Sequence, residues 1–228
     1  MNTIKNISIW FRRYPIISAT ILIILIFTAV FSHLISPHDP LYNSLRDRNV
    51  PPFFQEGGTT EHLLGTDPIG RDLLSRLIHG SRISMTVALI ALVIGTIVGG
   101  TLGLMAGYFG GYVDEIITRT VDIWAGLPYV LIALVVVGAI GPSLRTMVVL
   151  LVLVAWSPFV RQVRGEVLVL KDMEYVSAAK IAGASSYRIL FFLLLPGTIN
   201  TMIVVATLSV GHMILAEAFL SFLGAGIQ

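Results

Sequence analysis

The sequence predicts an all-α fold, a polytopic bundle of membrane-spanning helices, from three observations. Of its 228 residues, 55% are hydrophobic and only 12% are charged, whereas a soluble domain carries about 25% charged residues. The mean hydropathy is +0.86. Several apolar runs approach the length of about 20 residues that a helix needs to cross a bilayer. Together these values are typical of a polytopic membrane protein.

The composition also excludes several kinds of site. The chain has no cysteine, which excludes disulfides, thiol catalysis and cysteine-based metal sites. Its formal net charge is +2, so the sequence makes no case for nucleic acid, and we expect the basic residues to set membrane topology instead. No metal site and no cofactor is predicted. The first apolar run lacks a small-residue cleavage site and is expected to remain as an anchor.

Five apolar runs are expected to span the membrane as helices. They cover residues 16–35, 83–108, 121–140, 147–160 and 199–223, and the fourth is the shortest. We divide the chain accordingly into two parts. Residues 1–82 hold the first span, an extracytoplasmic loop and an amphipathic helix. Residues 83–228 form the membrane core, with a cytoplasmic loop at 161–196.

The positive-inside rule orients these spans. Basic residues precede the first run, so the N-terminus is expected in the cytoplasm, and five spans then leave Gln228 outside. The loop at 161–196 lies inside and is basic, as the rule requires. The loop at 36–82 is placed outside although it is rich in arginine. The residues concerned are Lys5, Arg12 and Arg13 before the first run, Arg161, Arg164, Lys171, Lys180 and Arg188 inside, and Arg46, Arg48, Arg71, Arg76 and Arg82 outside.

Two local patterns lie directly before the second apolar run and within it. Residues 70–83 are amphipathic, with Asp67 as a plausible N-cap and Pro68 at the first helical position. We interpret this segment as an interfacial helix, with a gating or lumen-lining role as the alternative. Within the run, glycines recur every fourth residue and predict close packing of a neighbouring backbone. They are Gly95, Gly99, Gly103 and Gly107.

The cytoplasmic loop has the pattern of a short helix followed by a turn. Its Ala- and Lys-containing start favours a helix from Glu174, Gly183 can end that helix, and the serines after Ala184 offer caps for the next one. Pro196 is expected to break the chain before the fifth span. Small residues on such a helix suit a contact that seats in a groove of another subunit. The alternative is an ordinary connector with the same spacing.

The spacing in this loop resembles the EAA loop of importer permeases of the ABC class. Nine residues separate Gly183 from Leu193, which is followed closely by Pro196, and an alanine pair stands shortly before the glycine. The stretches GTDPIGRDLLSRLIHGSRISM (65–85), VDEIITRTVDIWAGLP (113–128), GPSL (141–144), VRQVRGEVLVLKDMEYVSAAKIAGAS (160–185) and AEAFLSFLGAGIQ (216–228) are similar to C-type permease subunits of dipeptide, oligopeptide and nickel importers.

That resemblance implies a fold of the type I importer class and a set of partners. The partners are a second permease of B type, two ATP-binding subunits, an extracytoplasmic solute-binding protein and the lipid membrane. The chain would then be a multi-pass protein of a bacterial or archaeal cytoplasmic membrane and not itself an ATPase, and it contains no phosphate-binding GxxxxGK[ST] motif. The implied ATPase-coupling residues are Glu174, Tyr175, Ala178, Ala179, Gly183, Ala184 and Ser185.

Three features depart from the broad family pattern. Ser177 precedes the alanine pair where the broad motif has a glutamate, which is how the peptide subgroup reads. The end of the loop reads FLLLPG, without the polar residues that relatives place there. Relatives continue beyond the glycine near Gly224 into one more span, so we expect this chain to be a fragment that lacks the last family helix.

A few polar residues in apolar surroundings are further candidates. Glu217 is the one acid well inside an apolar run, since Asp122 stands at the very start of its run, and such a group is a functional candidate at the translocation path. A structural ion pair or snorkelling is the alternative. His212 is a poor partner for it, since the two residues lie roughly 140° apart on an ideal helix. Asp122 is expected to cap a helix or meet the interface.

The sequence thus predicts a permease subunit of an ABC importer that moves di- or oligopeptides inward. A nickel-chelate importer of the same family is the alternative. From other classes, a secondary transporter would need ionisable residues near the membrane midplane, of which the chain offers few. A non-transporting scaffold would not need the rigid cytoplasmic loop. The substrate itself is not predicted.

Overall fold

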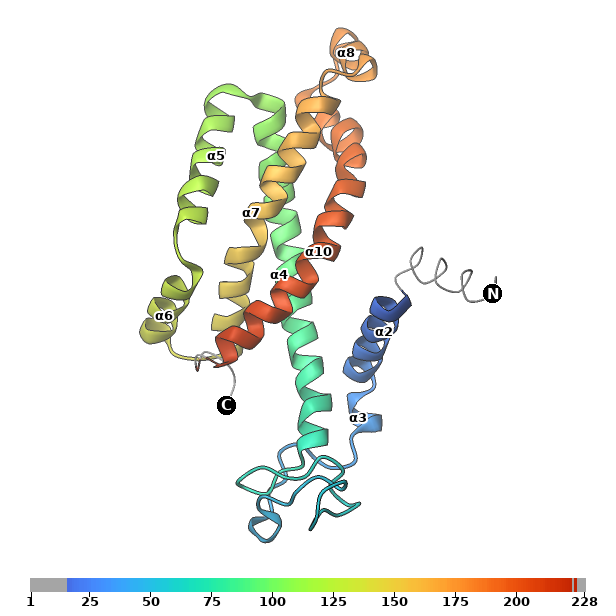
Figure 1. Cartoon of the computed structure of the whole chain (residues 1–228). Helices are drawn as coiled ribbons and strands as arrows, with labels where there is room; N and C mark the ends of the chain where they lie inside the picture. The colour runs from blue at the N-terminus through green and yellow to red at the C-terminus, as the bar shows by residue number, and fades with distance from the viewer. Residues whose placement is uncertain (1–15, 223, 225–228) are drawn as a thin grey trace, which may run out of the picture. The chain divides into compact units, whose positions relative to one another are not determined.

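The computed structural model describes residues 16–222 and Gly224, with side chains from Thr20 onward (Figure 1). The basic residues before the first run and the end at Gln228 lie outside the described residues, and so do the predictions that rest on them. The chain forms two compact units, Met1–Met85 and Thr86–Gln228. Each is described by itself.

The structure confirms an all-helical membrane fold. Three helical stretches are long and apolar enough to cross a bilayer: α4 (Leu73–Phe109), α7 (Leu144–Leu170) and the continuous stretch Ser186–Phe222. The pair α5 (Gly111–Gly126) and α6 (Tyr129–Ile140) makes a fourth if it is one span. Helix α2 (Ile16–Val30) contains a shorter apolar part, Thr20–Val30. The predicted five spans are reached only if the α5–α6 pair counts as one span and α2 counts as another.

The predicted third span, 121–140, is not one straight helix. Helices α5 and α6 meet at Leu127 and Pro128 with a bend of 83°. Leu127 is extended, with φ −86° and ψ 127°, because the residue before a proline is disfavoured in the α-helical region. Helix α5 also begins ten residues earlier than the apolar run, at Gly111.

The fourth span was predicted as the shortest, 147–160, and this is wrong. Helix α7 is a 27-residue helix that continues through Pro158 to Leu170. Phe159, Val163 and Val167 follow one another at intervals of four residues and are all fully buried, so the packed face of the helix extends beyond its most apolar part. Burial of this face supports the helix past the proline.

The predicted break at Pro196 is also wrong. A short helix α9 (Ser186–Arg188), a π-helical stretch η2 (Ile189–Leu194) and α10 (Leu195–Phe222) follow one another without interruption. A proline ring clashes with the carbonyl group four residues earlier in a regular α-helix. The wider π-turns lie directly before Pro196, and we attribute the continuity of the helix to them.

Helix α7 is the centre of the second unit, in contact with α5, α6 and α10. The four glycines that recur every fourth residue in α4 lie against it. A Cβ atom on Gly99 would stand 2.2 Å from the Trp156 carbonyl oxygen, and one on Gly103 would stand 2.8 Å from the Val160 carbonyl oxygen. Gly95 and Gly107 would meet Ala155 and Val167 at 2.4 Å and 2.7 Å. The two helices therefore approach as closely as a small-residue contact permits.

In the first unit, α3 (Ser32–Ile35), the 3₁₀ turn Leu45–Asp47 and a loop lead to the start of α4. The predicted N-cap is wrong: Ser75 N donates to Asp72 Oδ2 at 2.8 Å, so Asp72 caps α4. Asp67 instead organises the loop before it. It accepts hydrogen bonds from Arg71 N, Arg71 Nε (2.7 Å) and an Arg76 guanidinium nitrogen (2.6 Å).

These contacts involve arginines of the loop at 36–82, whose predicted outside location conflicts with the positive-inside rule. Arg71 and Arg76 form ion pairs with Asp67, and Arg48 Nε donates to the Pro68 carbonyl oxygen at 2.8 Å. Arg48, Arg71 and Arg76 are thus engaged within the loop. The pairing with Asp67 does not remove the conflict with an outside location, because acidic residues contribute little to the positive-inside rule.

Candidate coupling site

The predicted coupling residues lie on α8 (Glu174–Ile181) and in the turn after it (Figure 1). Helix α8 ends where Gly183 takes φ +77°, a conformation that L side chains rarely adopt. Gly183 N and Ala184 N donate to the carbonyl oxygens of Lys180 and Ala179 at 3.0 Å. Ser185 Oγ then caps the next helix by accepting from Arg188 N at 3.4 Å. The local sequence therefore forms a helix–turn–helix with hydrogen bonds at both ends of the turn.

A single side chain of α8 is deeply buried. Val176 is fully buried and belongs to a cluster that includes Val167 and Leu194. Glu174 and Ala178 are exposed, and Tyr175 is 45% exposed. Helix α8 is thus anchored by one residue at the junction of α7 and the last long helix, and it presents most of its surface outward.

The small residues of this region shape an apolar hollow. Its volume is about 340 Å³, and it is lined by Ala179, Ala184, Arg188, Phe192 and Leu193. Both alanines are half-buried. Nearby apolar side chains are open to solvent, with Ile181 89% and Phe192 66% exposed. An exposed apolar surface beside a hollow is typical of a protein–protein contact.

Three contacts connect this region to the end of α4. Lys171 Nζ donates to the Gly107 carbonyl oxygen at 3.0 Å. Lys180 Nζ lies 5.8 Å from the centroid of the Tyr108 ring, and Tyr108 donates to Ser186 Oγ at 3.5 Å. A displacement of α8 would therefore act on α4 as well as on α7 and α10.

Two ion pairs that the sequence analysis missed join α5 to α7. Arg164 binds both carboxylate oxygens of Asp114, with one bond at 2.6 Å. Arg161 binds Asp122 at 2.9 Å. Asp122 was expected to cap a helix or meet the interface; it does not cap a helix, because it lies inside α5 and is paired there. The sequence feature that could have predicted these ion pairs is the presence of charged residues beside apolar runs, since such charges usually find a partner of opposite sign.

Glu217 lies apart from the coupling residues, on α10. Its side chain is buried and accepts a hydrogen bond from Ser221 Oγ at 3.0 Å. Met213 and Leu220, on either side of it in sequence, belong to the core cluster of the second unit. His212 is exposed, and its ring lies 3.0 Å from the Leu208 carbonyl oxygen. The geometry therefore places Glu217 inside the bundle.

Residues 99–228 match the family described as binding-protein-dependent transport system inner membrane component. The chain is similar to the dipeptide transport system permease proteins of Bacillus subtilis (42% identical over 208 residues) and Escherichia coli K12 (43% over 221 residues). It is 34% identical over 218 residues to the glutathione transport system permease protein of Pectobacterium atrosepticum. These matches cover 91%, 96% and 95% of the chain, which spans 63%, 74% and 71% of the respective relatives.

Proposed function

Since the chain belongs to the family of binding-protein-dependent transport system inner membrane components, we propose that it forms part of the membrane pathway of an ABC importer for short peptides. The substrate class rests on relatives named for dipeptides and for glutathione, itself a tripeptide. The same names favour peptides over nickel chelates. Hydrolysis of ATP belongs to separate subunits in this proposal, and a binding protein delivers the peptide from outside.

The observation that carries the proposal is the architecture around α8. The helix is anchored by Val176 and is otherwise open, and it stands beside an apolar hollow of about 340 Å³. We propose that an ATP-binding subunit seats on this surface, through Glu174, Tyr175, Ala178, Ala179, Gly183, Ala184 and Ser185. A second permease of B type and a second ATP-binding subunit complete the assembly.

Coupling follows from the contacts at the ends of α8. When the ATP-binding subunits close, they push on α8, and the push reaches α7 and the last long helix through Val176. It reaches α4 through Lys171 and Tyr108. The spans then exchange between inward-facing and outward-facing arrangements, which nucleotide and the loaded binding protein favour to different degrees. The N-terminus and α8 lie on the cytoplasmic side in this scheme.

The docking surface is tested by substitutions that fill it. Ala179→Arg places a long charged side chain in the hollow, and Gly183→Val forces a branched residue into φ +77°. Both should reduce ATP-driven uptake of a labelled dipeptide into proteoliposomes at least tenfold and weaken copurification with the ATP-binding subunit. The control is Ala182→Arg, an exposed residue that does not line the hollow.

Three results would contradict parts of this proposal separately. Wild-type uptake by Ala179→Arg would remove the hollow as the docking surface. Equal losses in Ala182→Arg would show that the effect is not specific to the hollow. Normal copurification of the unaltered chain with the ATP-binding subunit, without dipeptide uptake, would overturn the substrate class and leave the docking assignment standing.

A further inference from the structure

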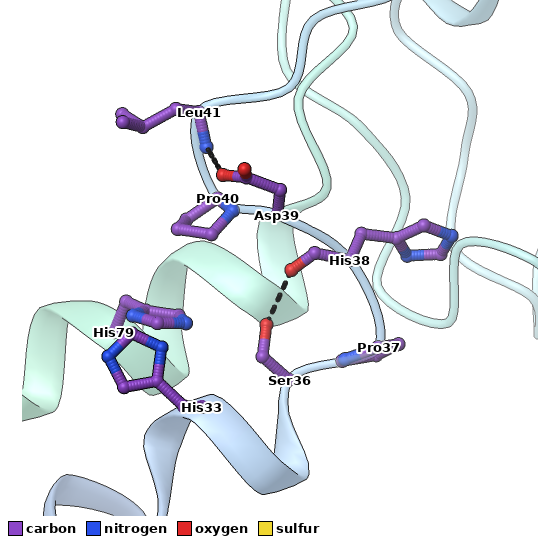
Figure 2. A pocket seen from close by; sticks show the side chains of 8 residues that line it. All are labelled: His33, Ser36, Pro37, His38, Asp39, Pro40, Leu41 and His79. Atoms are coloured by element: carbon purple, nitrogen blue, oxygen red, sulfur yellow. Dashed lines mark hydrogen bonds between the residues drawn. The ribbon is translucent and has the colours of Figure 1, made fainter.

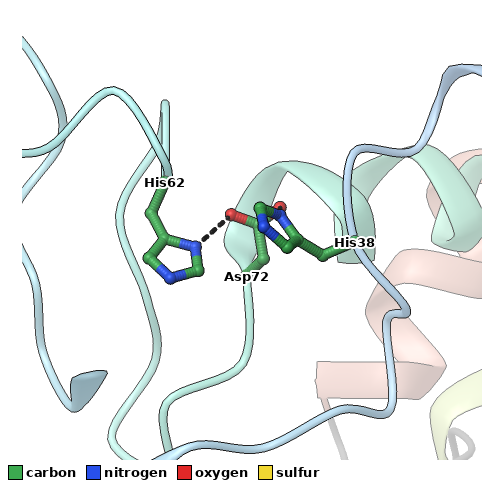
Figure 3. Close-up of side chains that lie close together, drawn as sticks. All are labelled: His38, His62 and Asp72. Carbon is green, nitrogen blue, oxygen red and sulfur yellow. Dashed lines mark hydrogen bonds and ion pairs between the residues drawn. The ribbon is translucent and has the colours of Figure 1, made fainter. Parts of the chain in front are cut away.

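Three polar side chains from separate segments of the first unit converge at the start of α4 (Figure 3). His38 follows α3, His62 lies in the loop, and Asp72 caps α4. His62 Nδ1 is 3.0 Å from Asp72 Oδ1, and His38 Nδ1 is 3.9 Å from Asp72 Oδ2. One donor atom from each residue lies within 4.8 Å of the others.

This group is largely withdrawn from solvent. The side chain of Asp72 is 2% exposed and that of His62 is 12% exposed. His38 Nδ1 is buried, and among the described residues it has no hydrogen-bond partner. A buried nitrogen without a partner is uncommon in folded proteins, and a bound water or ion is the usual explanation.

The backbone around His38 is held in place. His38 N donates to Ser75 Oγ at 3.0 Å, and Ser75 Oγ donates to Asp72 Oδ2 at 2.7 Å. On the other side, Ser36 Oγ donates to the His38 carbonyl oxygen at 2.6 Å. Figure 2 shows this bond at the edge of a hollow of about 530 Å³, with the His38 ring directed away from Ser36. The ring is therefore positioned before any ligand arrives.

A cavity of about 110 Å³ adjoins the group, with room for an ion and a water molecule. Besides the three side chains it is lined by Tyr42, Ser44, Asp47, Glu61 and Gly70. Within the part of the chain that the structure describes, this lining contains acids but neither lysine nor arginine. The cavity is therefore electrostatically suited to a cation.

We propose that His38, His62 and Asp72 bind a divalent transition-metal ion of the zinc class. Imidazole nitrogen and carboxylate oxygen are ligands that Zn²⁺ accepts at about 2.0 to 2.2 Å. Donors of a tetrahedral site then stand about 3.4 Å apart, and one donor atom from each of the three residues already lies within 4.8 Å of the others. The ion replaces the proton that His62 Nδ1 shares with Asp72, and a water from the cavity completes the coordination.

Such an ion would connect segments that are distant in sequence. It would link the segment that follows α3, the loop at His62 and the residue directly before α4, across 34 positions from His38 to Asp72. Its effect would be to stabilise the first unit, and this role is independent of the proposed transport activity.

The test uses the full chain in detergent, stripped of metal with a chelator. Zn²⁺ is titrated by calorimetry, and Co²⁺ is added as a spectroscopic probe of tetrahedral coordination. His38→Gln is the most informative variant, because the structure shows no hydrogen bond that its Nδ1 would lose. It should weaken Zn²⁺ binding at least tenfold and abolish the Co²⁺ absorption. The matched control is His212→Gln, an exposed histidine on α10, which should bind as the unaltered chain does.

His62→Gln provides a second, independent variant and should also weaken binding at least tenfold. In the unaltered chain, Zn²⁺ should slow hydrogen exchange of the amides between residues 38 and 72, and this protection should be lost in both variants. Binding of equal strength in His38→Gln and the unaltered chain would overturn the proposal. So would a loss in His212→Gln, or the absence of Zn²⁺ binding by the unaltered chain.

Discussion

At the scale of single residues, Asp67 is the carboxylate on which the loop before α4 depends. Burial alone would raise its pKa, but hydrogen bonds from Arg71, Ile69 and Arg76 outweigh burial and hold the pKa below the ordinary value of 3.8. A group with a lowered pKa stabilises the folded state above its unfolded pKa. That contribution is lost as the pH falls below about 4.

We therefore expect Asp67→Asn to lower the free energy of unfolding of the first unit by about 2 kcal/mol at neutral pH, as is typical when charged hydrogen bonds are lost. The thermal midpoint is measured by circular dichroism at pH 6 and at pH 3. The unaltered chain should lose more stability between these values than the variant does. Equal losses would show that Asp67 is not held ionised by its partners.

The two ion pairs between α5 and α7 form a natural comparison. Arg164 and Asp114 are 31% and 19% exposed, whereas Arg161 and Asp122 are 51% and 65% exposed. Solvent screens an exposed pair strongly. In double-mutant cycles with alanine, measured by unfolding in detergent, we expect a coupling energy of about 1 to 2 kcal/mol for the first pair. The second should give about 0.5 kcal/mol or less. Similar coupling energies for the two pairs would show that burial does not determine the strength of these ion pairs.

At the scale of helices, the contact between α4 and α7 depends on the absence of side chains. A methyl group on Gly99 would collide with the Trp156 carbonyl oxygen, whereas one on Gly165 of α7 would meet nothing within 4 Å. Gly99→Ala should destabilise the bundle by about 1 to 3 kcal/mol through overpacking. Gly165→Ala should be neutral or stabilise by up to about 1 kcal/mol, since alanine favours a helix.

Thermal unfolding of both variants in the same detergent checks this expectation. Gly99→Leu and Gly103→Leu should be more severe than the alanine change and should also impair assembly with the partner permease. If Gly99→Ala and Gly165→Ala shift the midpoint equally, the close approach of α4 and α7 does not limit stability.

At the scale of the whole molecule, the bent pair α5–α6 decides the sidedness of the chain. If the pair is one span, three crossings separate residue 56 from residue 177, and the two lie on opposite sides of the membrane. If it is a re-entrant loop, two crossings remain and both lie on the same side. The proposed orientation requires the first arrangement, with residue 177 in the cytoplasm.

The chain has no cysteine, so single cysteines report sidedness without background. Glu56→Cys and Ser177→Cys replace exposed residues. A maleimide that cannot cross the cytoplasmic membrane is applied to intact cells whose outer envelope it can pass. It should label the cysteine at position 56 and not the one at position 177, and inverted membrane vesicles should reverse this result. Labelling of both positions from one side would establish a re-entrant α5–α6 and contradict the proposed topology. The unaltered chain is the negative control.

The fold class, the family and the approximate positions of the apolar segments could all be predicted from the amino-acid sequence. Composition and run length decide whether a segment enters a bilayer, and the signal survives without any knowledge of tertiary contacts. The helix–turn–helix at Gly183 was also predictable, because a glycine with positive φ and a serine cap act within a few residues.

The positions at which helices bend and the charges that pair with one another became known only from the packed structure. Pro128 stands at a helix break and Pro158 does not, because α7 has buried residues on both sides of Pro158 that keep the helix continuous. Asp114 meets Arg164 across 50 positions of sequence, and Asp72 meets His38 across 34. Such contacts depend on the packing of distant segments, and neither hydropathy nor local spacing contains that information.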